Sequence, residues 1–132
     1  MIYEKLHLKD YFEFLGENGA DPTLEIYLPY NMTEMNRQNQ KRPCMVVCPG
    51  GGYSFCSQRE SEPISLNFLP EGFNVFVLTY TCAPAKFPTQ LREVAAVMEL
   101  IYKKNLSPTF ICESAGTQAE DAKAMKEYYL SL

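Results

Sequence analysis

The stretch CMVVCPGGGYSFCSQRE, residues 44–60, runs from a short apolar segment through three consecutive glycines into a polar region. An apolar run of this length is typical of a strand that is buried on both faces of a parallel sheet. A glycine loses more conformational freedom on folding than an alanine does, roughly 0.5–1 kcal/mol in regular structure. The sequence therefore raises the question of what approaches Gly50, Gly51 and Gly52 so closely that a side chain is not tolerated.

The composition is that of one globular domain, because the chain has 132 residues and 46% of them are hydrophobic. The net charge is −4 and the longest basic run is Lys41-Arg42, which argues against a nucleic acid partner. No apolar segment approaches the roughly 18 residues of a membrane span, and the N-terminus lacks signal-peptide features. The five cysteines are odd in number and form no C-x-x-C. We expect a reduced, cytoplasmic protein without membrane contact, disulfide framework, metal site or cofactor.

Strand and helix patterns alternate along the chain, which predicts βαβ units and therefore an α/β fold with a mostly parallel sheet and helices on both faces. Strands are predicted at residues 23–28, 44–48, 73–80 and 109–112. Helices are predicted after the capping-box pattern Ser57-Gln58-Arg59-Glu60, at residues 88–104 and at residues 117–132. Residues 30–42 are predicted to be a surface loop within a single domain, 1–132. The apolar helix faces would be Ile64, Leu66, Phe68 and Leu69 in the first helix, and Leu91, Val94, Ala95, Met98 and Ile101 in the second.

The glycine loop is compatible with more than one function. A dinucleotide fingerprint needs a third glycine that is absent here, and a phosphate loop needs G-K-[ST], which is also absent. The loop could instead present backbone N–H groups to a developing oxyanion, because side chains would block the approach of the substrate. It could also be a tight turn, although one or two glycines usually suffice for that.

A second motif follows the last predicted strand. The sequence Cys112-Glu113-Ser114-Ala115-Gly116 stands where a nucleophile elbow, G-x-S-x-G, would present a serine, with cysteine in place of the first glycine. Ser114 could alternatively cap the helix that follows. Together with the triple-glycine loop two strands earlier, the motif favours the elbow.

Residues 42–101, with P-G-G-G-Y in place of the lipase motif H-G-G-G, resemble the α/β-hydrolase esterase/lipase family, and in particular its acetyl-esterase and xylan-esterase-like members. The resemblance implies a partial α/β-hydrolase fold, three-layer αβα, and a small ester or an acetylated carbohydrate as substrate. It implies Ser114 as the nucleophile, and the N–H groups of Gly51, Gly52 and Ala115 as the oxyanion hole. It also places Gly50 and Tyr53 at the substrate.

The sequence departs from this family in its catalytic triad. The family's Asp or Glu and its His follow the elbow, whereas the sole histidine of this sequence is His7, which is expected to be an exposed strand residue. We therefore expect a truncated hydrolase-like domain with an incomplete triad, or alternatively a non-catalytic remnant that acts as a binding or oligomerising module. Because a strand at residues 109–112 would be left at the edge of the sheet, we also expect a homodimer or higher oligomer.

Overall fold

The computed structural model describes residues 1–104, 108–109 and 127. Its described strands form one sheet in the order β1-β2-β4-β3-β5. β4 pairs in parallel with β3, and β3 in parallel with β5, whereas β2 is antiparallel to both β1 and β4. The α/β class is confirmed, but the described sheet is mixed rather than mostly parallel, because β1 and β2 add an antiparallel edge. The strands are β1 Ile2–His7, β2 Thr23–Leu28, β3 Cys44–Val47, β4 Asn74–Thr79 and β5 Pro108–Thr109.

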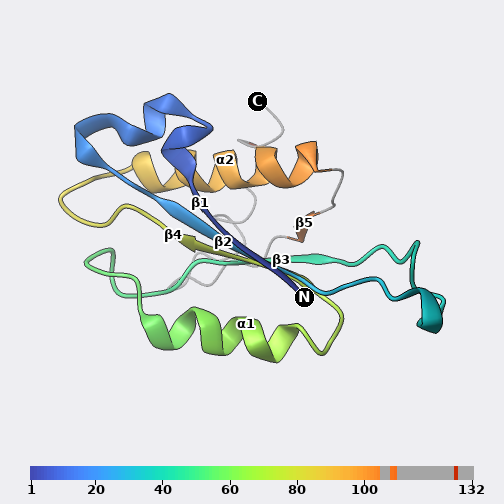
Figure 1. Cartoon of the computed structure of the whole chain (residues 1–132). Coiled ribbons are helices and arrows are strands. Elements are labelled where there is room, and N and C mark those ends of the chain that lie inside the picture. Colours follow the sequence, from blue (N-terminus) through green and yellow to red (C-terminus); the bar gives the residue numbers. More distant parts are fainter. Residues whose placement is uncertain (105–107, 110–126, 128–132) are drawn as a thin grey trace.

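Two α-helices cover opposite faces of this sheet, as Figure 1 shows: α1, Glu62–Phe68, on one side and α2, Thr89–Lys103, on the other. The predicted three-layer arrangement is thereby confirmed. Short 3-10 turns occupy connecting segments, namely Leu8–Asp10, Glu13–Gly19, Thr33–Met35 and Gln58–Glu60. The predicted loop 30–42 is almost wholly exposed. None of the helices in the described part of the chain is long and apolar enough to cross a membrane.

The hydrophobic core is divided between the two faces of the sheet, and β4 supplies both halves. Phe76 and Leu78 of β4 belong to the larger cluster, which also includes Val97 and Ile101 of α2, while Val75 and Val77 belong to the smaller one, against which Phe68 packs. All four β4 side chains are fully buried. Because successive strand residues point to opposite faces, the continuous apolar run of β4 follows from burial on both sides.

The predicted helix faces are only partly correct. In α1, Ile64 and Leu66 are exposed, and Ser65 is fully buried, where its hydroxyl donates to the carbonyl oxygen of Ser61 over 3.0 Å. In α2, Leu91 and Val94 are half-buried. Phe68 and Leu69 pack against the smaller core cluster, as predicted. A hydrophobic pattern does not register a buried polar residue such as Ser65, so only Ile64 and Leu66 were assigned to the core wrongly. Residues that α2 buries are Glu93, Ala95, Ala96, Val97, Met98, Leu100 and Ile101.

Glu93 is a fully buried carboxyl group on α2. Its Oε2 accepts a hydrogen bond from the N–H of Thr81 over 2.8 Å, while its Oε1 and the Thr81 hydroxyl have no hydrogen-bond partner among the described residues. Burial raises the pKa of Glu93, because a low-polarity environment disfavours the charged form. The helix is therefore attached through this carboxyl group to the start of the loop that follows β4.

Replacement of Glu93 tests this attachment. Glu93→Gln keeps an acceptor for Thr81 and removes the charge, whereas Glu93→Ala leaves the Thr81 N–H unpaired, at a cost of about 1–3 kcal/mol. The pKa of Glu93 is near 4.5 in the unfolded chain and higher in the folded protein. The folded protein therefore loses stability as pH rises from about 4.5 through the raised pKa. Urea unfolding at several pH values should therefore show that the Glu93→Gln protein loses less stability than the wild type as pH rises. Identical pH profiles would contradict a raised pKa.

Candidate active site

The loops that follow β3 and β4 lie together at the carboxyl ends of these two parallel strands, where open α/β sheets bind their ligands. The N–H of Ala83 donates to the carbonyl oxygen of Tyr53 over 2.7 Å. The hydroxyl of Tyr80 donates to the carbonyl oxygen of Pro49, and the rings of Tyr53 and Tyr80 lie 5.9 Å apart. These contacts join the two loops into one unit.

The geometry of the loop gives each of its three glycines a reason: close contact at Gly50 and Gly51, and a left-handed backbone at Gly52. A Cβ at Gly50 would lie 2.6 Å from Oε2 of Glu60, and a Cβ at Gly51 would overlap the carbonyl oxygen of Phe55. Gly51 has φ +147° and Gly52 has φ +61°, with open space beside Gly52. The groups that approach Gly50 and Gly51 are thus supplied by the chain itself. Gly52 is required for its left-handed backbone rather than for close contact.

The predicted capping box is wrong, because Glu60 has a different partner. Its Oε2 accepts a hydrogen bond from the N–H of Gly50 over 2.6 Å, and Ser57 makes no side-chain cap. The α-helix begins later, at Glu62 with Pro63 in its first turn. The Glu60 carboxylate therefore closes the glycine loop, which returns through a second hydrogen bond from the N–H of Ser57 to the carbonyl oxygen of Gly50 over 2.8 Å.

The backbone donors of the loop are not equivalent. The N–H of Gly50 is engaged by Glu60, whereas those of Gly51 and Gly52 donate to no described residue. These two groups are the oxyanion donors that the sequence predicts. Ser114 and Ala115, the other predicted members of that site, lie outside the described residues, as do residues 110–112 of the predicted last strand and nearly all of the predicted helix 117–132.

Aromatic side chains are exposed in the glycine loop and in the loop before α2. Tyr53, a predicted substrate residue, has a left-handed backbone with φ +59° and is 62% exposed. Phe55 is 60% exposed and Phe87, in the loop before α2, is 80% exposed. Cys48, which the apolar run predicted to be buried, is also exposed, because β3 ends at Val47. A surface of this kind can contact the apolar part of a ligand.

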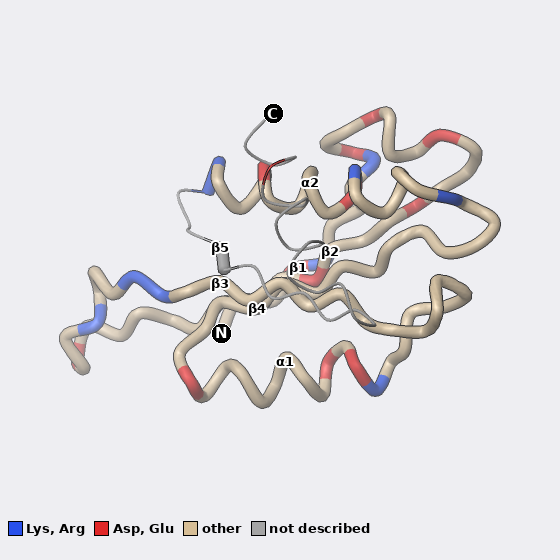
Figure 2. Tube along the Cα trace, turned by 180° about the vertical axis from the view of Figure 1, so that it is seen from behind, with Lys and Arg blue, Asp and Glu red and all other residues tan. Residues whose placement is uncertain are grey.

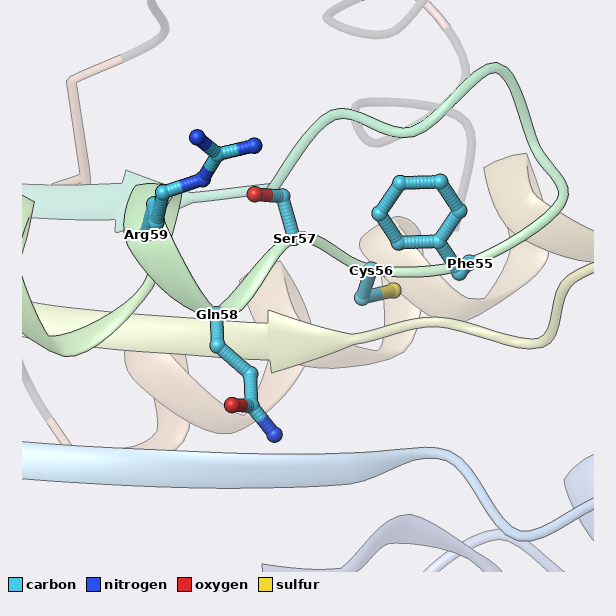
Figure 3. Close-up of a pocket in the computed structure, with 5 residues that line it drawn as sticks. All are labelled: Phe55, Cys56, Ser57, Gln58 and Arg59. Atoms are coloured by element: carbon cyan, nitrogen blue, oxygen red, sulfur yellow. The ribbon is translucent and has the colours of Figure 1, made fainter.

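A pocket of about 360 Å³ lies beside the loop and is lined by five consecutive residues, Phe55, Cys56, Ser57, Gln58 and Arg59. Figure 3 shows the Ser57 hydroxyl and the Arg59 guanidinium on one side of the segment and the Gln58 amide on the other. Arg59 forms no ion pair with any described residue. The S-x-x-E spacing of this segment predicts a helix cap, and that interpretation gave no indication that the segment lines a pocket.

His7 lies at the end of β1, in register with Thr23 of β2, which in turn pairs with Thr79 of β4. Its Nδ1 lies 2.9 Å from Oδ1 of Asp21, and this hydrogen bond lowers the pKa of Asp21. His7 is exposed, as predicted. Three strand spacings separate β1 from β3, about 14 Å in all, so His7 is not in hydrogen-bond reach of a group bound at the glycine loop.

The part of the site that the structure describes shows neither a metal cluster nor a concentration of positive charge. Within the described residues, no group of three or more His, Cys, Asp or Glu side chains is placed to hold a metal ion. Figure 2 shows that the Lys and Arg positions are scattered over several elements rather than gathered on one face. The chemistry that the described part of the site offers is therefore hydrogen-bond donation by the backbone and contact with aromatic surfaces.

Alanine substitutions distinguish the roles of Gly51 and Gly52. Gly52→Ala should cost about 1–2 kcal/mol, which is the strain of a left-handed alanine, because nothing stands near its Cβ. Gly51→Ala should cost more, because the new Cβ collides with the Phe55 carbonyl oxygen. Urea denaturation of both variants measures the difference. Equal losses of stability would show that the Phe55 carbonyl does not constrain Gly51.

The amino-acid sequence is similar to that of one curated enzyme over part of its length. It is 40% identical over 78 residues to endo-1,4-beta-xylanase B of Butyrivibrio fibrisolvens, covering 59% of this chain and 11% of that enzyme. No protein-family model matches the chain.

Solved structures of hydrolases share the fold. An α/β hydrolase enzyme from a Medee basin deep-sea metagenome library is 30% identical, with a TM-score of 0.65 over 80% of this chain and 40% of that one. The acetyl ester-xyloside bifunctional hydrolase of Caldicellulosiruptor lactoaceticus is 28% identical, with a TM-score of 0.65 over 79% of this chain and 39% of that one. The chain therefore spans about two fifths of the length of these hydrolases.

Proposed function

Because the chain carries part of the α/β-hydrolase fold, we propose that it is a carboxylic ester hydrolase of the acetyl-esterase type, with Ser114 as its nucleophile. The N–H groups of Gly51, Gly52 and Ala115 form its oxyanion hole. The observation that carries the proposal is the pair of glycine N–H groups that donate to no described residue at the carboxyl end of β3. Donors that are already oriented stabilise a developing oxyanion without reorganisation.

In this reaction the Ser114 hydroxyl attacks the ester carbonyl carbon, and the negative oxygen of the tetrahedral intermediate lies against the glycine N–H groups. A serine hydroxyl is a weak nucleophile unless a base removes its proton. His7, the one histidine of the sequence, lies about three strand spacings from the glycine loop. The chain acting alone should thus be slow, with oxyanion stabilisation and binding leaving a rate of about 10³–10⁴ over water.

The substrate class is a small ester, and in particular an acetylated carbohydrate. Two observations support this substrate class. The pocket beside the loop offers an aromatic ring, a hydroxyl, an amide and a guanidinium, which are the groups that bind the faces and hydroxyls of a sugar. The similar proteins include a xylanase and an acetyl ester-xyloside hydrolase. Gly50 holds the loop in position through Glu60, and the Tyr53 ring borders the bound ester.

The alternative function is a non-catalytic binding or oligomerising module with the same fold. The observation that favours it is the distance of His7 from the glycine loop. Either function is compatible with a homo-oligomer in the cytoplasm, with the β5 edge or residues 117–132 at its interface. β5 is the last strand of the described sheet on that side, and an unpaired strand edge is normally covered.

Hydrolysis of 4-nitrophenyl acetate tests the proposed activity. The chain should accelerate release of nitrophenolate over buffer, and Gly51→Ala should abolish the acceleration because it distorts the donor loop. His7→Ala should change nothing. Ser114→Ala should change the rate little, because in the chain alone, where Ser114 lacks a base, the remaining acceleration comes from attack by water on an ester held at the oxyanion donors. Circular dichroism of each variant serves as the control for folding. A rate equal to that of buffer would favour the non-catalytic alternative, and a fast rate abolished by Ser114→Ala would reveal a base.

Light scattering over a range of micromolar concentrations tests association. The chain should have the mass of a homodimer or a higher oligomer, because an exposed sheet edge pairs with another copy. A lysine introduced at the edge, Thr109→Lys, should shift the equilibrium towards monomer, while Asn39→Lys in the exposed loop 30–42 serves as a control with the same change of charge. A monomer at all concentrations would contradict the proposal.

A further inference from the structure

Two cysteine thiols meet between the two loops of the candidate site. The Sγ atoms of Cys56, after the glycine loop, and Cys82, after β4, lie 3.8 Å apart. Each thiol also lies 3.6 Å from the same acceptor, the carbonyl oxygen of Tyr80. The two sulfur atoms are therefore directed to one point, although 26 residues separate them in the sequence.

The two cysteines are accessible from solvent, and the segments that carry them are held close together. Both cysteines are half-buried, and Cys56 lines the pocket beside the loop, so a small reagent can reach the pair from solvent. The segments that carry them are already joined by the hydrogen bond from Ala83 to Tyr53. Closing the sulfur–sulfur distance from 3.8 Å to the roughly 2.05 Å of a disulfide requires a movement of less than 2 Å, about that of a side-chain rotation.

We propose that Cys56 and Cys82 form a reversible disulfide when the protein meets a low-molecular-weight disulfide such as oxidised glutathione. The pair is a modification site that joins the loop after β3 covalently to the loop after β4. The inference does not depend on ester hydrolysis, because it rests on the two thiols alone. If the proposed function holds, the bridge also fixes the glycine loop that carries the oxyanion donors.

The reaction is a double thiol–disulfide exchange. One cysteine thiolate attacks a sulfur of oxidised glutathione, which forms a protein–glutathione disulfide and releases one glutathione thiolate. The second cysteine loses its proton to solvent and attacks the protein-bound sulfur, which releases the second glutathione. Two protein thiols are oxidised to one disulfide, one glutathione disulfide is reduced to two thiols, and the two protons end on the glutathione products.

The reaction has a characteristic dependence on pH. Burial and the neighbouring Cys82 thiol raise the pKa of Cys56 to about 11, and only the thiolate is nucleophilic. One cysteine attacks glutathione disulfide and the other attacks the mixed disulfide, so Cys56 is the nucleophile in one of the two steps whichever cysteine reacts first. The rate of that step is proportional to the fraction of Cys56 that is thiolate. The rate of bridge formation should rise about tenfold per pH unit between about pH 7 and pH 9.

The experiment exposes the full chain to oxidised glutathione and then blocks the remaining thiols by alkylation. Intact mass should show two fewer alkyl groups on the monomer than on an alkylated reduced control, and peptide fragmentation should place the bridge between Cys56 and Cys82. Dithiothreitol should restore both thiols. The thermal unfolding midpoint should rise by several degrees on oxidation, because the bridge closes a loop in the unfolded chain.

Matched variants separate this bridge from other oxidation. Cys56→Ser and Cys82→Ser should each abolish both the bridge and the rise in the unfolding midpoint, whereas Cys48→Ser should leave them intact, because Cys48 is exposed at the end of β3. Fragmentation of the wild-type chain gives the answer even if a variant fails to fold. A bridge that involves Cys48 or a second chain, or glutathione retained on Cys56 or Cys82 without ring closure, would overturn the proposal.

Discussion

The hydrogen bond from the N–H of Gly50 to the carboxylate of Glu60, 2.6 Å long, is the constraint on which the candidate site depends. It joins two residues that are ten positions apart in the sequence, and the carboxylate occupies the space that a side chain at position 50 would need. Inside this closed loop, Gly51 approaches the Phe55 carbonyl oxygen and Gly52 adopts a left-handed backbone. A hydrogen bond to a charged acceptor is stronger than one between neutral groups, so the loop has a defined shape in which the next two N–H groups donate to none of the described residues.

The segment that follows β4 holds the glycine loop in place through hydrogen bonds. Tyr80 donates to Pro49, and Ala83 donates to Tyr53, while the buried Glu93 carboxyl group of α2 binds the backbone of Thr81. A chain of contacts therefore runs from the helix through the second loop to the glycines. Because β3 and β4 are parallel neighbours, their carboxyl ends bring these segments together, and the order of the strands determines which segments can meet.

Sequence reasoning predicted most of this fold, because the strands and α2 carry strong apolar patterns. It failed where polar groups are buried. Ser65 and Glu93 are both fully buried, and a pattern of hydrophobic residues cannot reveal them. The capping box at Ser57 failed for another reason, since its spacing is correct but Gly50, ten residues earlier, competes for Glu60. The glycine loop itself is evident from three consecutive glycines after an apolar run, whereas the pocket at Arg59 depends on a turn that the sequence does not specify.

The position of Tyr80 gives this chain an internal optical signal. The sequence contains no tryptophan, so its near-ultraviolet absorption comes mainly from tyrosine, and Tyr80 is the tyrosine whose ring, hydroxyl and carbonyl all contact the loops of the site. Burial raises its pKa well above the ordinary tyrosine value, so its phenolate absorbs only in strongly alkaline solution. Any ligand or substitution that separates the two loops would hydrate this phenol and bring its ionisation to lower pH. Burial also raises the pKa of Tyr27, to about 12, so the difference between the absorbance titrations of the wild type and a Tyr80→Phe protein reports on the contact between the two loops, without a label and without knowledge of the substrate.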